Sequence, residues 1–246
     1  AVLAAVLGGC GVDDRPSGVD AVVSGPLAGD ASVDTTVAAA SPSVRPLTEE
    51  ESALAEEVET LVEPVVPRPS TIAVVGDSLT QSAEDEIMYA LVRRGLHVLA
   101  IDGLESRRMS HGGQSLPPGT EAVDTILADS DPGMWVVALG TNDVASDRSL
   151  DDFRTEMRDV LDRIPMDDPV IWVDLWIGGD EELVARANRM IRVELARRVG
   201  GTAVVDWYSH GTDDGVITAD GVHLTPTGQE LFADSIAVAV DELFAD

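Results

Sequence analysis

The sequence predicts an α/β fold in which a doubly wound, five-stranded parallel sheet lies between two layers of helices. From residue 71 onward, short β-branched runs alternate with amphipathic segments of helical length. The expected strands are nearly continuous apolar runs, which is typical of parallel strands covered on both faces. Because a helix follows each expected strand, the pattern indicates a three-layer α/β/α domain.

The expected elements alternate along the chain. Strands are expected at residues 71–75, 97–101, 134–139, 170–175 and 202–207. Helices are expected near residues 80–94, 118–129, 150–164, 180–199 and 226–244. Gly95 and Gly200 stand where C-terminal caps are expected, and Ser149 with Asp152 predicts a helix N-cap. Ligands of such sheets bind outside the carboxyl ends of the strands, so the loops that follow the strands are the candidate site.

The segments before residue 71 are expected to lie outside this domain. Residues 1–10 are small and apolar and end in Leu-Gly-Gly-Cys, which resembles a bacterial lipobox with Cys10 as the lipidated residue. The run is too short to span a bilayer and is interpreted as the end of an export signal. Two alternatives stay open, namely a frayed apolar terminus with an incidental cysteine and the end of a transmembrane helix.

Two further segments separate this run from the domain at residues 71–246. Residues 11–46 are rich in Gly, Ser, Pro, Ala, Asp and Thr without periodicity, which predicts a disordered tether. Thr48 and Glu51 have the spacing of a capping box, so residues 47–70 are expected to form a short acidic helix and a proline-rich linker.

The composition excludes several classes of function. The 246 residues include 16 Lys and Arg, all of them Arg, against 45 Asp and Glu, a formal net charge of −29. This charge argues against a nucleic-acid binder and against electrostatic docking on anionic lipid. One cysteine allows neither an intramolecular disulfide nor a multi-cysteine metal site. We therefore expect no metal and no cofactor, and we interpret the acidic surface as a solvating one.

Three of the five loops contain unusual polar clusters, Gly-Asp-Ser-Leu-Thr at residues 76–80, Gly-Thr-Asn-Asp at 140–143 and Asp-Gly-Val-His at 220–223. Ser78 lies at a strand-to-helix turn, where helix amides favour a developing negative charge. His223 can act as a base at neutral pH, and Asp220 is close enough in sequence to orient it. Asn142 can donate its side-chain amide to an oxyanion. Each motif alone is common in turns, whereas their joint occurrence at strand ends predicts a catalytic site.

Together these motifs resemble three of the four signature blocks of the SGNH, or GDSL-type, hydrolases, over about residues 71–244. The resemblance implies a flavodoxin-like SGNH hydrolase fold. It also implies that Ser78 is the nucleophile, Asp220 the orienting acid and His223 the base. The implied oxyanion hole consists of the Ser78 amide, the Asn142 side chain and a glycine amide from the second block.

The second block departs from the family pattern. The expected glycine falls on Ser106, whose amide can still serve as a donor if this residue accepts the required backbone angles. Gly103 is the alternative position. The neighbouring Arg107 and Arg108 are interpreted as solvated, with a position flanking the pocket as the alternative. Trp176, after the fourth expected strand, is a candidate wall of an acyl or sugar pocket, with core or rim packing as the alternative.

The sequence thus predicts an exported, lipid-anchored serine esterase of the cell envelope. Its expected substrate is an acyl ester, including an acetyl ester, on an envelope glycan or lipid. The expected membrane contact is the lipid anchor at Cys10, and no nucleic-acid partner is expected. Two other functions stay open, an O-acyltransferase with the same triad and a non-catalytic surface binding module.

Overall fold

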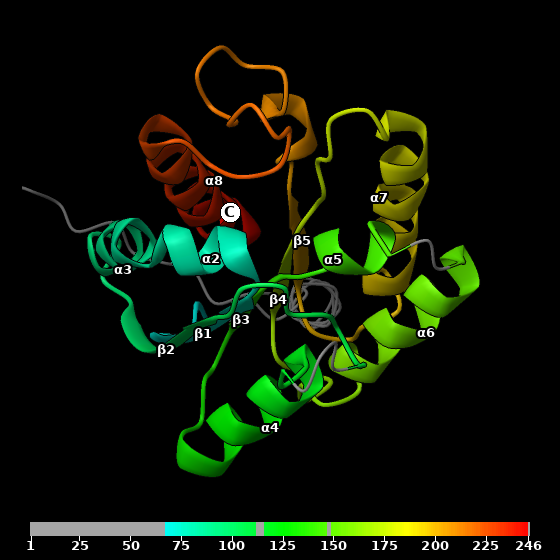
Figure 1. Ribbon diagram of the computed structural model, residues 1–246. Coiled ribbons are helices and arrows are strands. Elements are labelled where there is room, and N and C mark those ends of the chain that lie inside the picture. Colours follow the sequence, from blue (N-terminus) through cyan, green and yellow to red (C-terminus); the bar gives the residue numbers. More distant parts are fainter. Residues whose placement is uncertain (1–66, 112–115, 147–148, 246) are drawn as a thin grey trace, which may run out of the picture. The chain divides into compact units, whose positions relative to one another are not determined.

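The computed structural model describes residues 67–111, 116–146 and 149–245, in which five strands form one parallel sheet (Figure 1). The strands are β1 (Thr71–Gly76), β2 (His97–Gly103), β3 (Trp135–Ala138), β4 (Val170–Val173) and β5 (Thr202–Val205). Their order is β2-β1-β3-β4-β5, and each neighbouring pair is parallel. The order reverses direction at β1, as in a doubly wound sheet, so the predicted fold class is confirmed.

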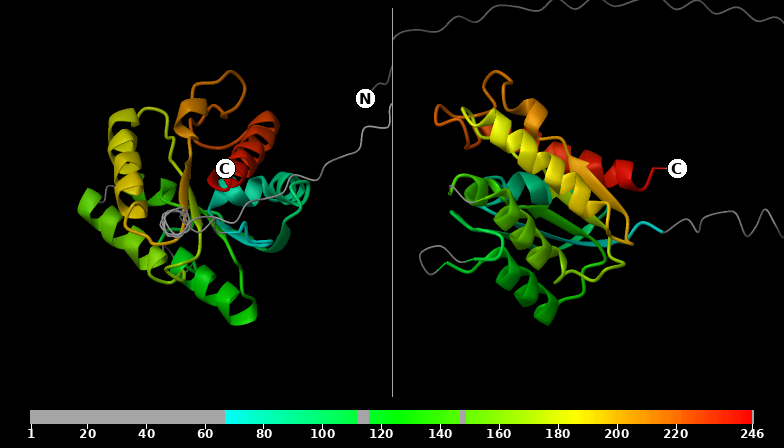
Figure 2. Two further views of the ribbon diagram at one scale, coloured as in Figure 1. Left: turned by 180° about the vertical axis from the view of Figure 1, so that it is seen from behind. Right: turned by 90° about the vertical axis from the view of Figure 1, so that its right-hand side faces the viewer.

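Helices cover both faces of this sheet. They are α2 (Ser78–Ser82), α3 (Glu84–Val92), α4 (Gly119–Asp129), α5 (Thr141–Val144), α6 (Leu150–Leu161), α7 (Glu181–Leu195), the 3-10 helix η1 (Tyr208–His210) and α8 (Pro226–Leu243). One core lies between the sheet and the pair α3 and α8, and the other lies under α4, α6 and α7 (Figures 1 and 2).

Strand β1 shows how the sequence builds two cores at once. Ile72 and Val74 point into the core under α3 and α8, whereas Ala73 and Val75 point into the core under α4, α6 and α7. All four side chains are fully buried. Alternate residues of a strand point to opposite faces, so a strand covered on both faces must be apolar at every position.

The predicted caps and helix ends were right in part. Ser149 and Asp152 form a capping box at the start of α6, as predicted, and Gly95 has a positive φ of 77° just beyond α3. The single helix expected near residues 80–94 is wrong. Ala83 has a φ of −111° and a ψ of 19°, outside the helical region, and so ends α2 before α3 begins.

Gly200 is not a helix cap, which corrects a second expectation. Helix α7 ends at Leu195, and its C-cap residue is Ala196. A Cβ on Gly200 would lie 2.5 Å from the carbonyl oxygen of Asp168 and 2.6 Å from that of Asp167. The glycine is therefore needed for close approach of two backbone segments.

The segments predicted before the domain lie almost wholly outside the described residues. This applies to the export signal, Cys10, the tether and the acidic helix, which fall within residues 1–66. In the described ranges, no helix combines the length and the apolar character needed to cross a membrane.

The sheet brings the polar clusters of the sequence to one edge. In the strand register, Gly76 at the end of β1 lies between Gly103 at the end of β2 and Ala138 at the end of β3. The loops after these three strands therefore begin side by side. The loop after β5 and η1 returns to the same edge before α8, because Ser78 contacts His223.

Candidate active site

Ser78 begins helix α2 directly after the end of β1. The preceding residue, Asp77, caps this helix by accepting a hydrogen bond from the amide of Leu79 at 3.0 Å. The Ser78 hydroxyl oxygen lies 3.2 Å from Nε2 of His223, although the two residues are 145 positions apart in the sequence. The structure thus places the predicted nucleophile within hydrogen-bond distance of the predicted base.

The predicted acid lies on the other side of the same imidazole. Asp220 Oδ2 is 2.7 Å from Nδ1 of His223. Its second oxygen, Oδ1, accepts hydrogen bonds from the Thr218 hydroxyl at 2.7 Å, the Val222 amide at 2.9 Å and the His223 amide at 3.0 Å. Gly221 has a φ of 79°, which lets the chain turn tightly between the acid and the base.

These contacts decide the protonation of the acid and the tautomer of the base. The hydrogen bond from Thr218, followed by those from His223, holds the pKa of Asp220 far below that of an ordinary carboxyl. An ionised carboxylate only accepts hydrogen bonds, so Nδ1 of His223 carries the proton. In the neutral ring, the lone pair of Nε2 then faces the Ser78 hydroxyl and can accept its proton.

The acid and the base are open to solvent. The side chain of Asp220 is 52% exposed and that of His223 is 51% exposed. Water can therefore reach the imidazole beside Ser78 directly.

Ser106, in the loop after β2, adopts a backbone conformation that usually favours glycine. Ser106 has a φ of 60°, and it is the one non-glycine residue with positive φ in the part of the chain that the structure describes. The amides of Ser78 and Ser106 both donate no hydrogen bond within the described ranges. Both are free to serve as donors to an oxyanion.

Gly103 has a different reason to be glycine. A Cβ on this residue would lie 2.3 Å from the amide nitrogen of Gln81, so helix α2 can pass the end of β2 only where a side chain is missing. The Gln81 side chain in turn accepts a hydrogen bond from the Glu105 amide at 2.8 Å. Close packing explains Gly103 without an oxyanion role, and Ser106 is the stronger candidate.

Asn142 lies in the short helix α5, which follows β3. Its Nδ2 atom donates to the carbonyl of Arg107 at 3.0 Å and lies 3.4 Å from Oδ2 of Asp77. The side chain therefore lies between the turn that carries Ser78 and the loop that carries Ser106. Its amide group thus contacts both the residue before Ser78 and the residue after Ser106.

Three buried ionisable side chains support this region, and the sequence did not identify them as such. Arg107 is 3% exposed, which corrects the expectation that it is solvated. Burial raises the pKa of Asp77 to about 6. The hydrogen bonds from Leu79 and Thr141 lower this pKa, but their effect is smaller than that of burial. Asp143 accepts from the amide of Met109 at 3.2 and 3.3 Å.

The side chain of Asp143 is buried next to a second carboxyl. Burial, followed by the hydrogen bond and the charge of Glu156, raises the pKa of Asp143 well above its ordinary value. Glu156 is itself 1% exposed and contacts Nδ1 of His111 at 3.2 Å. Nothing in the Gly-Thr-Asn-Asp sequence indicates that Asp143 is buried beside Glu156.

The remaining sequence candidates lie elsewhere. Trp176 is 7% exposed and packs edge-on against Tyr208, with ring centroids 5.4 Å apart, so the core-packing alternative is favoured.

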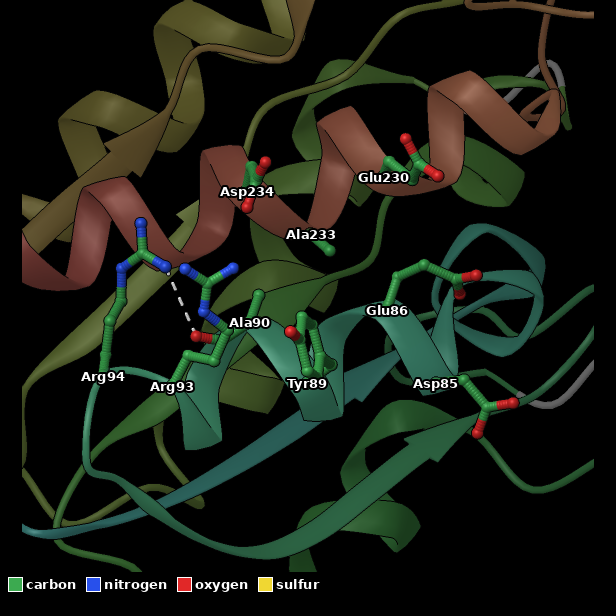
Figure 3. Close-up of a pocket in the computed structure, with 9 residues that line it drawn as sticks. All are labelled: Asp85, Glu86, Tyr89, Ala90, Arg93, Arg94, Glu230, Ala233 and Asp234. Atoms are coloured by element: carbon green, nitrogen blue, oxygen red, sulfur yellow. Dashed lines mark hydrogen bonds between the residues drawn. The ribbon is translucent and has the colours of Figure 1, made fainter. Parts of the chain in front are cut away.

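A groove of about 390 Å³ lies between α3 and α8 and includes Tyr89 and Arg93, but neither Ser78 nor His223 lines it (Figure 3). Among the described residues, no group of three or more His, Cys, Asp and Glu side chains could hold a metal ion.

No family model matches the sequence, and no curated protein matches it either. Several solved structures share the fold. The C-terminal catalytic domain of Streptococcus pneumoniae peptidoglycan O-acetyltransferase A is 20% identical, with a TM-score of 0.53, over 71% of this chain and 94% of that domain. A Clostridium thermocellum family 3 carbohydrate esterase is 17% identical, with a TM-score of 0.55, over 70% of this chain and 96% of the esterase.

A third similar structure is a lipolytic protein of the G-D-S-L family from Desulfitobacterium hafniense. It is 14% identical, with a TM-score of 0.57, over 69% of this chain and 99% of that protein. The described domain therefore has the fold of SGNH or GDSL hydrolases, as the sequence motifs implied.

Proposed function

We propose that this protein is a serine ester hydrolase in which Ser78, His223 and Asp220 form the catalytic triad. The observation that carries the proposal is the unbroken series of contacts from Ser78 Oγ to His223 Nε2, at 3.2 Å, and from His223 Nδ1 to Asp220, at 2.7 Å. An ionised acid, an oriented imidazole and an adjacent hydroxyl are the arrangement that activates a serine nucleophile.

In the proposed reaction, Ser78 attacks the ester carbonyl while His223 takes its proton. The tetrahedral intermediate carries a negative oxygen, which accepts hydrogen bonds from the amides of Ser78 and Ser106 and from the Asn142 side chain. His223 then donates its proton to the departing alcohol. Water, activated by the same imidazole, releases the acid from the acyl-enzyme and regenerates Ser78.

For the substrate, we propose a short acyl ester, such as an acetyl ester, on a carbohydrate. Two of the proteins with this fold are, by name, a carbohydrate esterase and a peptidoglycan O-acetyltransferase. A cell-envelope glycan fits the export signal and lipid anchor proposed from residues 1–10. Mass analysis of the protein from its native envelope tests the anchor, since an unmodified Cys10 thiol would refute it.

The same triad could transfer the acyl group to a sugar hydroxyl instead of water. The O-acetyltransferase domain among the similar structures favours testing this second function. The half-exposed triad favours hydrolysis, because water reaches the imidazole without obstruction. Product analysis in the presence of an excess of oligosaccharide acceptor separates the two, since transfer produces an acylated oligosaccharide in place of free acid.

The central test compares the full chain with its Ser78→Ala variant on short-chain aryl esters. We expect the variant to lose activity by about 10⁴-fold or more and to escape labelling by a fluorophosphonate probe. Ser82→Ala is the matched control, because Ser82 lies on the same helix and donates only to the Leu79 carbonyl. Equal activity of wild type and Ser78→Ala, with no labelling of Ser78, would leave the non-catalytic binding module as the better function.

A further inference from the structure

The guanidinium of Arg107 joins the two strand ends at which the proposed site begins. Its NH1 atom donates to the Gly76 carbonyl at 3.1 Å and to the Asp102 carbonyl. Its NH2 atom donates to Asp102 Oδ1 at 2.8 Å, and Nε points at the Pro117 carbonyl at 3.4 Å. Gly76 ends β1 and is two residues from Ser78, so the side chain of Arg107 holds the backbone that leads to the nucleophile.

The main chain of Arg107 is fixed from two further directions. Its carbonyl accepts the hydrogen bond from Nδ2 of Asn142 at 3.0 Å. Its amide donates to the Leu104 carbonyl at 3.1 Å, which closes a turn around Ser106. That turn is the one in which Ser106 has its positive φ.

Arg107 is thus linked to each of the three proposed oxyanion donors. Its side chain binds the Gly76 carbonyl, two residues before Ser78. It follows Ser106 directly in the chain, and its carbonyl accepts the hydrogen bond from Asn142. Its own side chain is 3% exposed, and its bond to the Gly76 carbonyl is buried.

We propose that Arg107 is a positioning residue for oxyanion stabilisation, which sets the mutual geometry of the three donors without touching the substrate. This inference rests on the proposed esterase function. Only arginine suits the position, because its planar, forked donors reach the carbonyls of Gly76 and Asp102 and the Asp102 carboxylate together. A lysine ammonium at the same place is a compact point charge and cannot bond all of these oxygens in one plane.

The test measures kcat and KM of Arg107→Lys and Arg107→Met on a short-chain aryl ester, in parallel with binding of a boronic acid that mimics the tetrahedral intermediate. We expect kcat to fall about 10²–10³-fold, as when one oxyanion donor is removed. We expect KM to stay within about threefold, because the donors act on the transition state rather than on the bound ester. Boronic acid affinity is expected to fall in parallel with kcat.

Arg192→Met is the control, since Arg192, itself 48% exposed, pairs with the buried Asp174 outside the proposed site. It should lower thermal stability while kcat and boronic acid affinity stay unchanged. Arg107→Lys keeps the charge and provides a folded variant if Arg107→Met does not fold. Wild-type kcat and boronic acid affinity in a folded Arg107 variant would overturn the inference. Failure of the esterase proposal is distinct, because wild type itself would then be no more active than Ser78→Ala.

Discussion

The two loops that supply the other proposed catalytic groups around Ser78 are built differently. The acid–base loop at residues 218–223 is half exposed, and its acid and base are held by hydrogen bonds within six residues of chain. The oxyanion loop at residues 104–109 is held by partners from β1, α2, α5 and the end of β2, several of them buried. The first loop is therefore specified locally, whereas the second depends on the tertiary structure. Loss of a polar side chain in the first loop should alter activity alone, whereas loss of a side chain that holds the second loop in place should alter activity and stability together.

The largest expected effect is that of Asp220→Asn on the acid–base side. The asparagine no longer fixes the imidazole tautomer, so we expect kcat to fall about 10⁴-fold. The asparagine keeps an Oδ1 acceptor for Thr218, Val222 and His223, so the melting temperature should change by less than about 2 °C. Steady-state kinetics and thermal unfolding of the same preparation check both. A large loss of stability would contradict the difference between the two loops.

Asn142→Ala is the corresponding change on the oxyanion side. Loss of one donor is expected to lower kcat about 10²–10³-fold. The Arg107 carbonyl also loses its hydrogen-bond donor, which costs about 1–3 kcal/mol and should lower the melting temperature by several degrees. If stability is unchanged, the oxyanion loop does not depend on Asn142 in the way proposed.

Asp143→Asn tests the buried carboxyl pair through pH. The raised pKa of Asp143 means that the folded state keeps a proton which the unfolded chain releases above pH ~4. Its contribution to stability is therefore full below pH ~4 and is lost as pH rises toward the folded-state pKa. We expect the free energy of unfolding to fall with rising pH less steeply in Asp143→Asn than in wild type, by at most about 1.4 kcal/mol per pH unit.

Urea unfolding at a series of pH values measures this difference. Asp234→Asn is the control, because Asp234 is exposed on α8. Parallel pH profiles for wild type and Asp143→Asn would show that Asp143 does not retain a proton in the folded state.

The smallest expected effect is that of Ser106→Gly. Glycine adopts positive φ without the steric cost that a side chain brings, so the free energy of unfolding should rise by about 1 kcal/mol or less. The backbone amide remains, so kcat is expected to stay within about threefold of wild type. A loss of stability would mean that the Ser106 side chain has a role of its own.

The same division explains what the sequence could predict. The pairing of Asp220 with His223 could be predicted from the sequence, because their spacing alone brings the carboxylate to the ring. The departure at Ser106 was recognised, and its backbone angle agrees with the condition placed on it. Arg107 was misjudged as solvated, because nothing in an Arg-Arg pair within a polar loop indicates which side chain is buried. Its partners, Gly76 and Asp102, become neighbours only through the parallel pairing of β1 and β2.

The helix boundaries failed for related reasons. No breaker residue marks the end of α2, which ends at the non-helical backbone of Ala83, so residues 80–94 were predicted as one helix. Gly200 is the residue type expected at a helix cap, but here it allows close approach to the backbone of Asp167 and Asp168. The Gly-Thr-Asn-Asp motif was interpreted as loop, whereas residues 141–144 form the short helix α5 that aims Asn142 at the Arg107 carbonyl. For Gly200 and Asn142 the deciding contact is distant in sequence, whereas α2 ends through the local backbone conformation of Ala83.

The separation of Ser78 and His223 by 145 residues has a consequence for the order of events during synthesis. The ribosome makes β1 and the serine first, and it makes the base and the acid only just before α8. Because α8 covers one face of the sheet beside α3, that face stays open until the last helix has been made. A nascent chain therefore carries Ser78 without its contact to His223 for most of its synthesis, and that contact forms only after nearly the whole domain has been translated.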